Sequence, residues 1–140
     1  VTALHEAVYK RRDLVVALLA AGANTNVKDN NNCGATSVYW GAWDSTADIL
    51  QLLIDGGGSV NEANNVRLTP LMVLVRNNDG DAAARLAVLL ACPDLDLDAA
   101  YAGCTAEQHA VKRERWTGCR GAWIAATAAP TATLSIISYV

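Results

Sequence analysis

The chain has 140 residues, of which 52% are hydrophobic and 18% charged, and it contains no phenylalanine. A chain of this length can bury a sizeable core within one compact unit. Eleven basic against 14 acidic residues give a formal net charge of −3, which argues against a nucleic-acid-binding surface. The four cysteines show no paired spacing, so we expect reduced thiols and an intracellular, cytoplasmic protein.

One pattern of residues recurs along the chain at nearly constant intervals. A threonine begins each copy, and successive copies are 34, 33 and 36 residues apart: Thr2, Thr36, Thr69 and Thr105. An apolar segment follows each threonine, and three copies continue with a leucine pair: Leu18-Leu19, Leu52-Leu53 and Leu89-Leu90. Helices of about two to three turns are too short to be stable alone in water. Such helices must therefore pack in pairs, and the pairs must stack on one another.

The details of these copies resemble the ankyrin repeat, whose pattern is T-P-L-H-x-A-A, then a leucine-rich second helix, then G-A-D-x-N. The best matches are Thr69-Pro70-Leu71, Thr2-Ala3-Leu4-His5-Glu6-Ala7, Gly22-Ala23-Asn24 and Asn26. The resemblance covers about residues 1–116. It implies an all-α solenoid of three to four stacked helix-turn-helix units with short hairpin or turn fingers.

The resemblance also implies a function. We expect a non-catalytic module that binds a protein partner through a concave groove and the finger tips, without a cofactor, a metal or a small-molecule ligand. The alternative is a regulatory ankyrin segment of a larger enzyme, channel or effector protein. The chain begins without Met and partway through a unit, so we expect a fragment of a longer array.

We divide the chain into units at residues 1–33, 34–66, 67–102 and 103–116, of which the last is a partial, polar capping unit. We expect residues 117–140 to be a divergent tail that contains a degraded last helix. Residues 122–140 carry no charge, and their length approaches the ~20 residues of a membrane span. Thr, Ser and Pro dilute this segment and no basic residue follows it, so we do not expect membrane insertion.

The first unit contains a complete set of helix signals. We expect Thr2 to cap the first helix, because its hydroxyl can accept a bond from a first-turn N–H group. His5, three residues later, is placed as the capping partner. Four apolar residues give the second helix a buried stripe: Leu14, Val15, Leu18 and Leu19. Gly22 then permits a left-handed exit.

The second unit departs from the family pattern. Tyr39 stands where ankyrin repeats usually have histidine, which puts that hydrogen-bond link in doubt. Trp40 is expected in the core beside Gly41. Ser45 and Asp48 have the spacing of a capping box for the second helix.

Candidate partner-binding residues follow from the place of each residue in the expected stack. Seven residues after each threonine the chain has Tyr9, Trp43, Arg76 and Lys112, at the ends of the first helices along the groove. The flanking positions are Lys10, Asp44, Asn77 and Arg113. Finger tips would add Asn31, Asn32, Ala35, Asn65, Val66, Leu68, Tyr101, Ala102 and Cys104. Tyr, Trp and Arg are enriched in binding hot spots. The alternatives are that Trp43 packs against the next unit and that the Asn-rich loop is only solvated.

The sequence gives little support for a catalytic or a metal-binding site. Cys104 lies five residues before His109, but this spacing across a helix start does not align a thiol with an imidazole, and no orienting third group stands out. No C-x₂-C pair accompanies the two histidines, as a zinc site requires. The aspartates after Pro93 lack the glycine and glutamate of a calcium loop.

Overall fold

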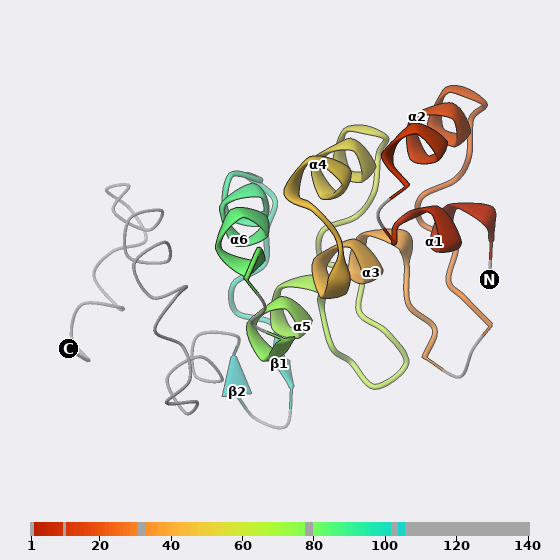
Figure 1. Ribbon diagram of the computed structural model, residues 1–140. Coiled ribbons are helices and arrows are strands. Elements are labelled where there is room, and N and C mark those ends of the chain that lie inside the picture. Colours follow the sequence, from red (N-terminus) through yellow and green to blue (C-terminus); the bar gives the residue numbers. More distant parts are fainter. Residues whose placement is uncertain (1, 10, 31–32, 78–79, 102–103, 106–140) are drawn as a thin grey trace.

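The computed structural model describes residues 2–9, 11–30, 33–77, 80–101 and 104–105. Helices within these residues pack in consecutive pairs, which stand side by side as a stack (Figure 1). The pairs are α1 (Ala3–Ala7) with α2 (Arg12–Ala20), α3 (Ser37–Asp44) with α4 (Ala47–Asp55), and α5 (Pro70–Asn77) with α6 (Ala82–Leu90). The predicted helical solenoid is confirmed. Of the proposed fourth unit only Cys104 and Thr105 are described, and the tail lies outside the described residues.

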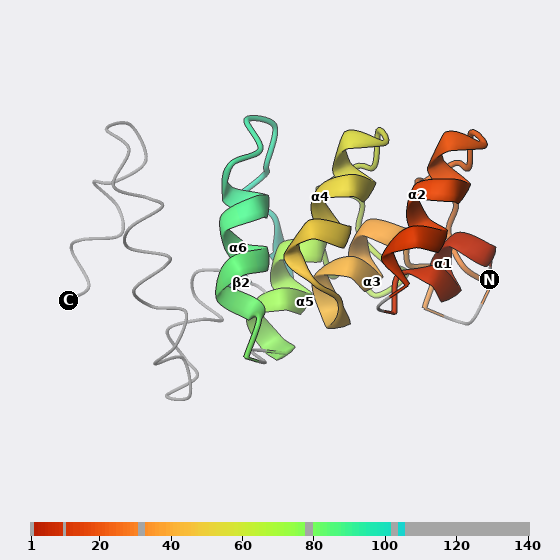
Figure 2. The same cartoon turned by 45° about the horizontal axis from the view of Figure 1, so that its top comes forward.

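The helices form two layers (Figure 2). The first helix of each pair packs on the first helix of the next, so that α3 contacts both α1 and α5. The second helices do the same, with α4 between α2 and α6. The core lies between these layers and includes Leu4, Val15, Leu50, Leu71 and Leu86, each at most 2% exposed. Because each buried aliphatic side chain contributes roughly 1.5–3 kcal/mol, the interfaces between pairs stabilise helices too short to persist alone.

Three of the four recurring threonines, Thr2, Thr36 and Thr69, directly precede first helices, as predicted. Thr105 lies in a two-residue strand, and the helix expected after it is outside the described residues. The Thr36 hydroxyl accepts a hydrogen bond from the Tyr39 amide at 3.3 Å, and Thr69 does the same for the Met72 amide at 3.3 Å. Thr2 and His5 form the expected capping box, in which the Thr2 amide donates to Nδ1 of His5 at 3.1 Å. The repeated threonine therefore fixes where each first helix starts and which face it buries.

Two glycines end the second helices of the first two units. Gly22 and Gly57 have φ values of 80° and 87°, in the left-handed region that glycine adopts without strain. The next amide in each case, from Ala23 and Gly58, bonds back to a carbonyl of the last helical turn. The left-handed exit predicted at Gly22 is confirmed.

The capping box predicted from Ser45 and Asp48 is wrong. The helix begins one residue later, with Thr46 as its N-cap, and the Asp48 carboxylate hydrogen-bonds the Thr46 side chain. Ser45 is buried and donates its hydroxyl to the Val8 carbonyl at 3.0 Å. The three-residue spacing of Ser45 and Asp48 could not show that the Ser45 hydroxyl would instead bind a carbonyl of the preceding unit.

Hairpin fingers connect the units and lie on the side of the first helices (Figure 1). The first finger is closed by the Asp29 amide donating to the Ala35 carbonyl, and the second by the Asn64 amide donating to the Leu68 carbonyl, both at 2.9 Å. In the third, β1 (Ala100–Tyr101) pairs antiparallel with β2 (Cys104–Thr105). The predicted short fingers are therefore present.

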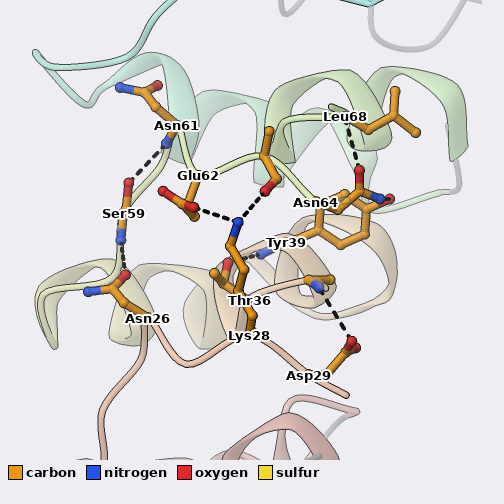
Figure 3. Close-up of polar contacts among 12 residues, drawn as sticks. Asn26, Lys28, Asp29, Thr36, Tyr39, Ser59, Asn61, Glu62, Asn64 and Leu68 are labelled. Atoms are coloured by element: carbon orange, nitrogen blue, oxygen red, sulfur yellow. Dashed lines mark hydrogen bonds and ion pairs between the residues drawn. The ribbon is translucent and has the colours of Figure 1, made fainter. Parts of the chain in front are cut away.

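An asparagine in each of the first two units ties that unit to the next. The Asn26 side chain donates to the Gly57 carbonyl at 2.9 Å. It also accepts from the Ser59 amide at 2.8 Å (Figure 3). Asn61 repeats this arrangement with the Asp94 carbonyl and the Asp96 amide, at 2.6 and 2.8 Å. These asparagine bridges fix the spacing between successive pairs, and so the position of the first-helix ends.

Candidate protein-binding surface

The ends of the first helices form a row of exposed side chains. Tyr9 follows α1 and is 42% exposed, and Trp43 near the end of α3 is 39% exposed. Arg76, at the corresponding place in α5, is also exposed. We call the surface formed by Tyr9, Trp40, Trp43, Asp44 and Arg76 the first-helix surface.

Hydrogen bonds between units hold this surface in place. Ser45 binds the Val8 carbonyl, next to Tyr9, and the Asn77 side chain donates to the carbonyl of Trp43 itself. Each bond satisfies a carbonyl that the end of a short helix would otherwise leave without an intrahelical partner. The backbone that carries the exposed aromatic residues is thus fixed by the following unit.

An aromatic cluster lies at the join of the first two units. The rings of Tyr9 and Trp40 have centroids 6.2 Å apart and a tilt of 48°, and Tyr39 meets Trp40 edge-on at 5.7 Å. The indole N–H of Trp40 donates to the Asp29 carboxylate at 2.8 Å. Trp40 is half-buried, so its expected place in the core is only partly correct. Its N–H needs a polar partner, and the first finger provides one.

The second finger is held by one buried asparagine (Figure 3). The side-chain oxygen of Asn64 accepts from the amides of Val66 and Leu68, at 3.1 and 2.9 Å. Its Nδ2 donates to the hydroxyl of Tyr39 at 3.1 Å and also lies 3.3 Å from Sγ of Cys33. Tyr39 therefore links its unit to the next finger, in the way that His5 reaches the Ala35 carbonyl at 3.1 Å. The hydrogen bond to the next finger, which the replacement of histidine by Tyr39 put in doubt, is therefore made by the phenol hydroxyl of Tyr39.

The first two fingers also contact each other directly. Lys28 forms an ion pair with Glu62 at 2.7 Å and donates to the Ala63 carbonyl at 3.0 Å (Figure 3). The Asn65 amide donates to the Cys33 carbonyl at 2.8 Å. These contacts place the tip of the second finger, with Val66 and Arg67, against the first.

Acidic groups surround the exposed tyrosine. Partial burial raises the pKa of Tyr9, and the negative charges of Asp44, Glu6 and Asp29 raise it further. The phenol therefore stays neutral at physiological pH, as a hydrogen-bonding and apolar group. Glu6 is exposed and Asp44 half-buried. The first two units thus present aromatic rings beside carboxylates.

Two of the predicted binding residues are corrected by the structure. Ala35 is 1% exposed and Leu68 is 7% exposed, and both belong to the hydrophobic core. Their amides and carbonyls close the hairpins, so neither lies at a tip. The tip of the second finger is formed by Asn65, Val66 and Arg67, all exposed, with Val66 at 54%.

The remaining predicted residues fall into three groups. Asp44 and Asn77 are half-buried beside the first-helix ends. Tyr101 belongs to β1, where its backbone pairs with Cys104. The others lie outside the described residues: Lys10, Asn31, Asn32, Ala102, Lys112 and Arg113.

Sequence reasoning missed the contributions of Trp40, Asp29 and Arg67. Trp40 precedes Trp43 by three residues, which places both on one side of α3, and this spacing was the available signal. Asp29 is 11 residues from Trp40, so no local pattern could pair them. Arg67 stands where the other fingers have Gly34 and Gly103, two residues before the threonine, and only alignment of the units reveals it.

Among the described residues, the side chains considered for catalysis offer no reactive pair, and His109 lies outside them. Both ring nitrogens of His5 are engaged, and its side chain is 3% exposed. Cys33 and Cys92 are free thiols, and burial, with Asp55 and Asp94, raises the pKa of Cys92. Such a thiol is less ionised than an ordinary cysteine, and therefore less nucleophilic. No cluster of potential metal ligands occurs among the described residues.

Comparison with known proteins supports the repeat assignment. The ankyrin repeat family model matches residues 1–30, which contain α1, α2 and the start of the first finger. No curated protein matches the sequence. In the part of the chain that the structure describes, every helix is too short or too polar to cross a membrane.

Proposed function

We propose that this stack, whose first 30 residues match the ankyrin repeat, is a non-catalytic module that binds a protein partner through the first-helix surface and the finger tips. Ankyrin repeats generally mediate protein–protein interactions, which is the general class of function that the match indicates. We assign the units to residues 1–33, 34–66 and 67–102, with a capping unit at 103–116 and a tail from residue 117.

One observation carries the proposal. Tyr9 and Trp43 occupy equivalent positions in successive units, and each is about 40% exposed although both are among the largest apolar side chains of the chain. Hydrogen bonds from the next unit fix the backbone beside each of them. Large, rigid aromatic side chains contribute much contact area with little loss of conformational entropy, which is why they dominate binding hot spots.

The finger tip of the second unit extends this surface. Val66 is the most exposed large apolar residue among those described, and the Asn64 network holds the backbone around it. A tip already ordered in the free protein loses little entropy on binding. A specific interface buries about 1,200–2,000 Å² in total, so we expect a partner to use both the fingers and the first-helix surface.

A comparison of captured proteins tests this function. The tagged chain and a Tyr9→Ala/Trp43→Ala/Arg76→Ala variant are used as baits in the same cell extract. Val16→Ala is the matched control, because Val16 is 40% exposed but lies on α2 in the other layer. We expect proteins retained by the parent and the control to be lost from the triple variant. Equal retention by all three baits would overturn the proposed function.

A further inference from the structure

The charges on the first-helix surface are unevenly distributed between units. Glu6, Asp29 and Asp44 act together on the phenol of Tyr9, so they converge on the join of the first two units. The positive charge of Arg76 lies one unit further along, near the end of α5, and acts on Tyr39 on the other side of Trp40. A ligand group on the Tyr9 side of the aromatic cluster therefore meets an acidic environment.

The aromatic rings at this join are suited to a cation. The faces of Trp and Tyr rings are electron-rich and attract cations. The Asp29 carboxylate accepts the Trp40 indole N–H at 2.8 Å, and this bond to an anion increases the electron density of the indole ring. Trp43 is exposed on the same helix, three residues further along, and is followed directly by Asp44.

We propose, as a refinement that rests on the proposed function, that the join formed by Tyr9, Trp40, Trp43 and Asp44 binds an arginine side chain from the partner protein. The guanidinium group stacks on the exposed aromatic rings, and its N–H groups donate to the Asp44 carboxylate. Arginine fits better than lysine because its flat, weakly hydrated group can stack and pair with a carboxylate at the same time.

The position of Asp44 agrees with a role in binding. Asp44 is the last residue of α3, at the negative end of the helix dipole, where a carboxylate is unfavourable. We therefore expect Asp44→Asn to leave the fold intact and to raise its stability slightly, while it weakens binding of a cation. A purely structural aspartate would instead lose stability on this substitution.

Four short peptides test the proposal on the full chain. The probe is acetyl-Gly-Arg-Gly-Arg-Gly-amide, and its controls replace arginine with neutral citrulline, which has nearly the same shape, or with glutamate. Binding is followed through the indole N–H signals of Trp40 and Trp43 in ¹⁵N-labelled protein, assigned with Trp40→Phe and Trp43→Phe. We expect saturable shifts with the arginine peptide and binding about fivefold weaker or more with citrulline. A lysine peptide should bind more weakly than arginine.

Charge variants provide the second readout. Asp44→Asn should weaken binding of the arginine peptide about twofold to fivefold, as loss of a partly exposed ion pair predicts. Asp13→Asn removes the same charge from an exposed position on α2 and should leave binding of the arginine peptide unchanged. Equal binding of the arginine and citrulline peptides, preference for glutamate, or no saturable shift at ~5 mM peptide would overturn the proposal. The proposed function would survive that result, because a surface for a neutral or acidic segment still loses its partner in the triple variant.

Discussion

At the scale of single residues, the first two fingers have the same left-handed backbone conformation at equivalent positions, but with different residues. Gly34 has a φ of 59° and Arg67 a φ of 66°, at equivalent positions. Glycine at the first avoids strain at this φ, and a Cβ there would also force the side chain of Asn65 to move. Arg67 occupies the left-handed region at a cost of roughly 1–2 kcal/mol, and the bonds around Asn64 hold it there.

Removal of this strain should stabilise the protein. We predict that Arg67→Gly raises the free energy of unfolding by about 1 kcal/mol, because glycine adopts this φ without a steric penalty. Urea denaturation measures the change. Gly34→Ala is the matched comparison and should lower stability, since it introduces both strain and a collision. A loss of stability in Arg67→Gly would show that the arginine side chain makes a contact worth more than the strain.

The raised pKa of Tyr39 should make the stability of the protein depend on pH in the alkaline range. Burial, followed by the nearby Cys33, raises the pKa of Tyr39 to about 12. The unfolded chain ionises this phenol near pH 10, so between pH 10 and about 12 the unfolded state has released a proton that the folded state retains. Stability is therefore fully present below pH 10 and falls as pH rises through this window, by up to about 3 kcal/mol.

The Tyr39→Phe variant isolates this effect. It removes the phenol and should unfold with a shallower loss of stability between pH 10 and 12 than the parent, as measured by denaturant melts at fixed pH steps. At neutral pH the variant should be about 1 kcal/mol less stable, because the Asn64 amide loses its bond to the hydroxyl. If the free energy of unfolding fell equally with pH in the two proteins, the alkaline loss of stability would not come from Tyr39.

At the scale of elements, the asparagine bridges couple one helix pair to the next. We predict that Asn61→Asp lowers the free energy of unfolding by about 1–2 kcal/mol, because a carboxylate cannot donate to the Asp94 carbonyl. Asn26→Asp should do the same through the Gly57 carbonyl. Asn30→Asp adds the same charge at an exposed finger position and serves as the control in urea denaturation. Equal stability of all four proteins would show that apolar packing alone sets the spacing of the pairs.

Much of the element order could be predicted because it depends on local signals. The caps at Thr36 and Thr69 and the left-handed exit at Gly22 are each decided within a few residues. Ser45 shows where this reasoning ends. Its hydroxyl bonds a carbonyl 37 residues away, so its role depends on the stack and not on the local spacing.

At the scale of the whole molecule, the period of the repeats predicted which residues share a surface. Tyr9, Trp43 and Arg76 are exposed in register because equivalent positions meet equivalent environments along the stack. Prediction of the finger tips failed at Ala35 and Leu68, since counting back from the threonine does not show where a hairpin turns. The pairing of Trp40 with Asp29 depends on the folded finger, and no period encodes it.

The most direct test of the account is a paired measurement on Trp43→Ala. Binding to a partner that the parent captures is compared with helical content by far-ultraviolet circular dichroism. We predict that binding weakens by at least about tenfold, the loss expected for a hot-spot tryptophan, while helical content barely changes. Loss of the helical signal, or binding equal to that of the parent, would contradict a binding role for this exposed side chain.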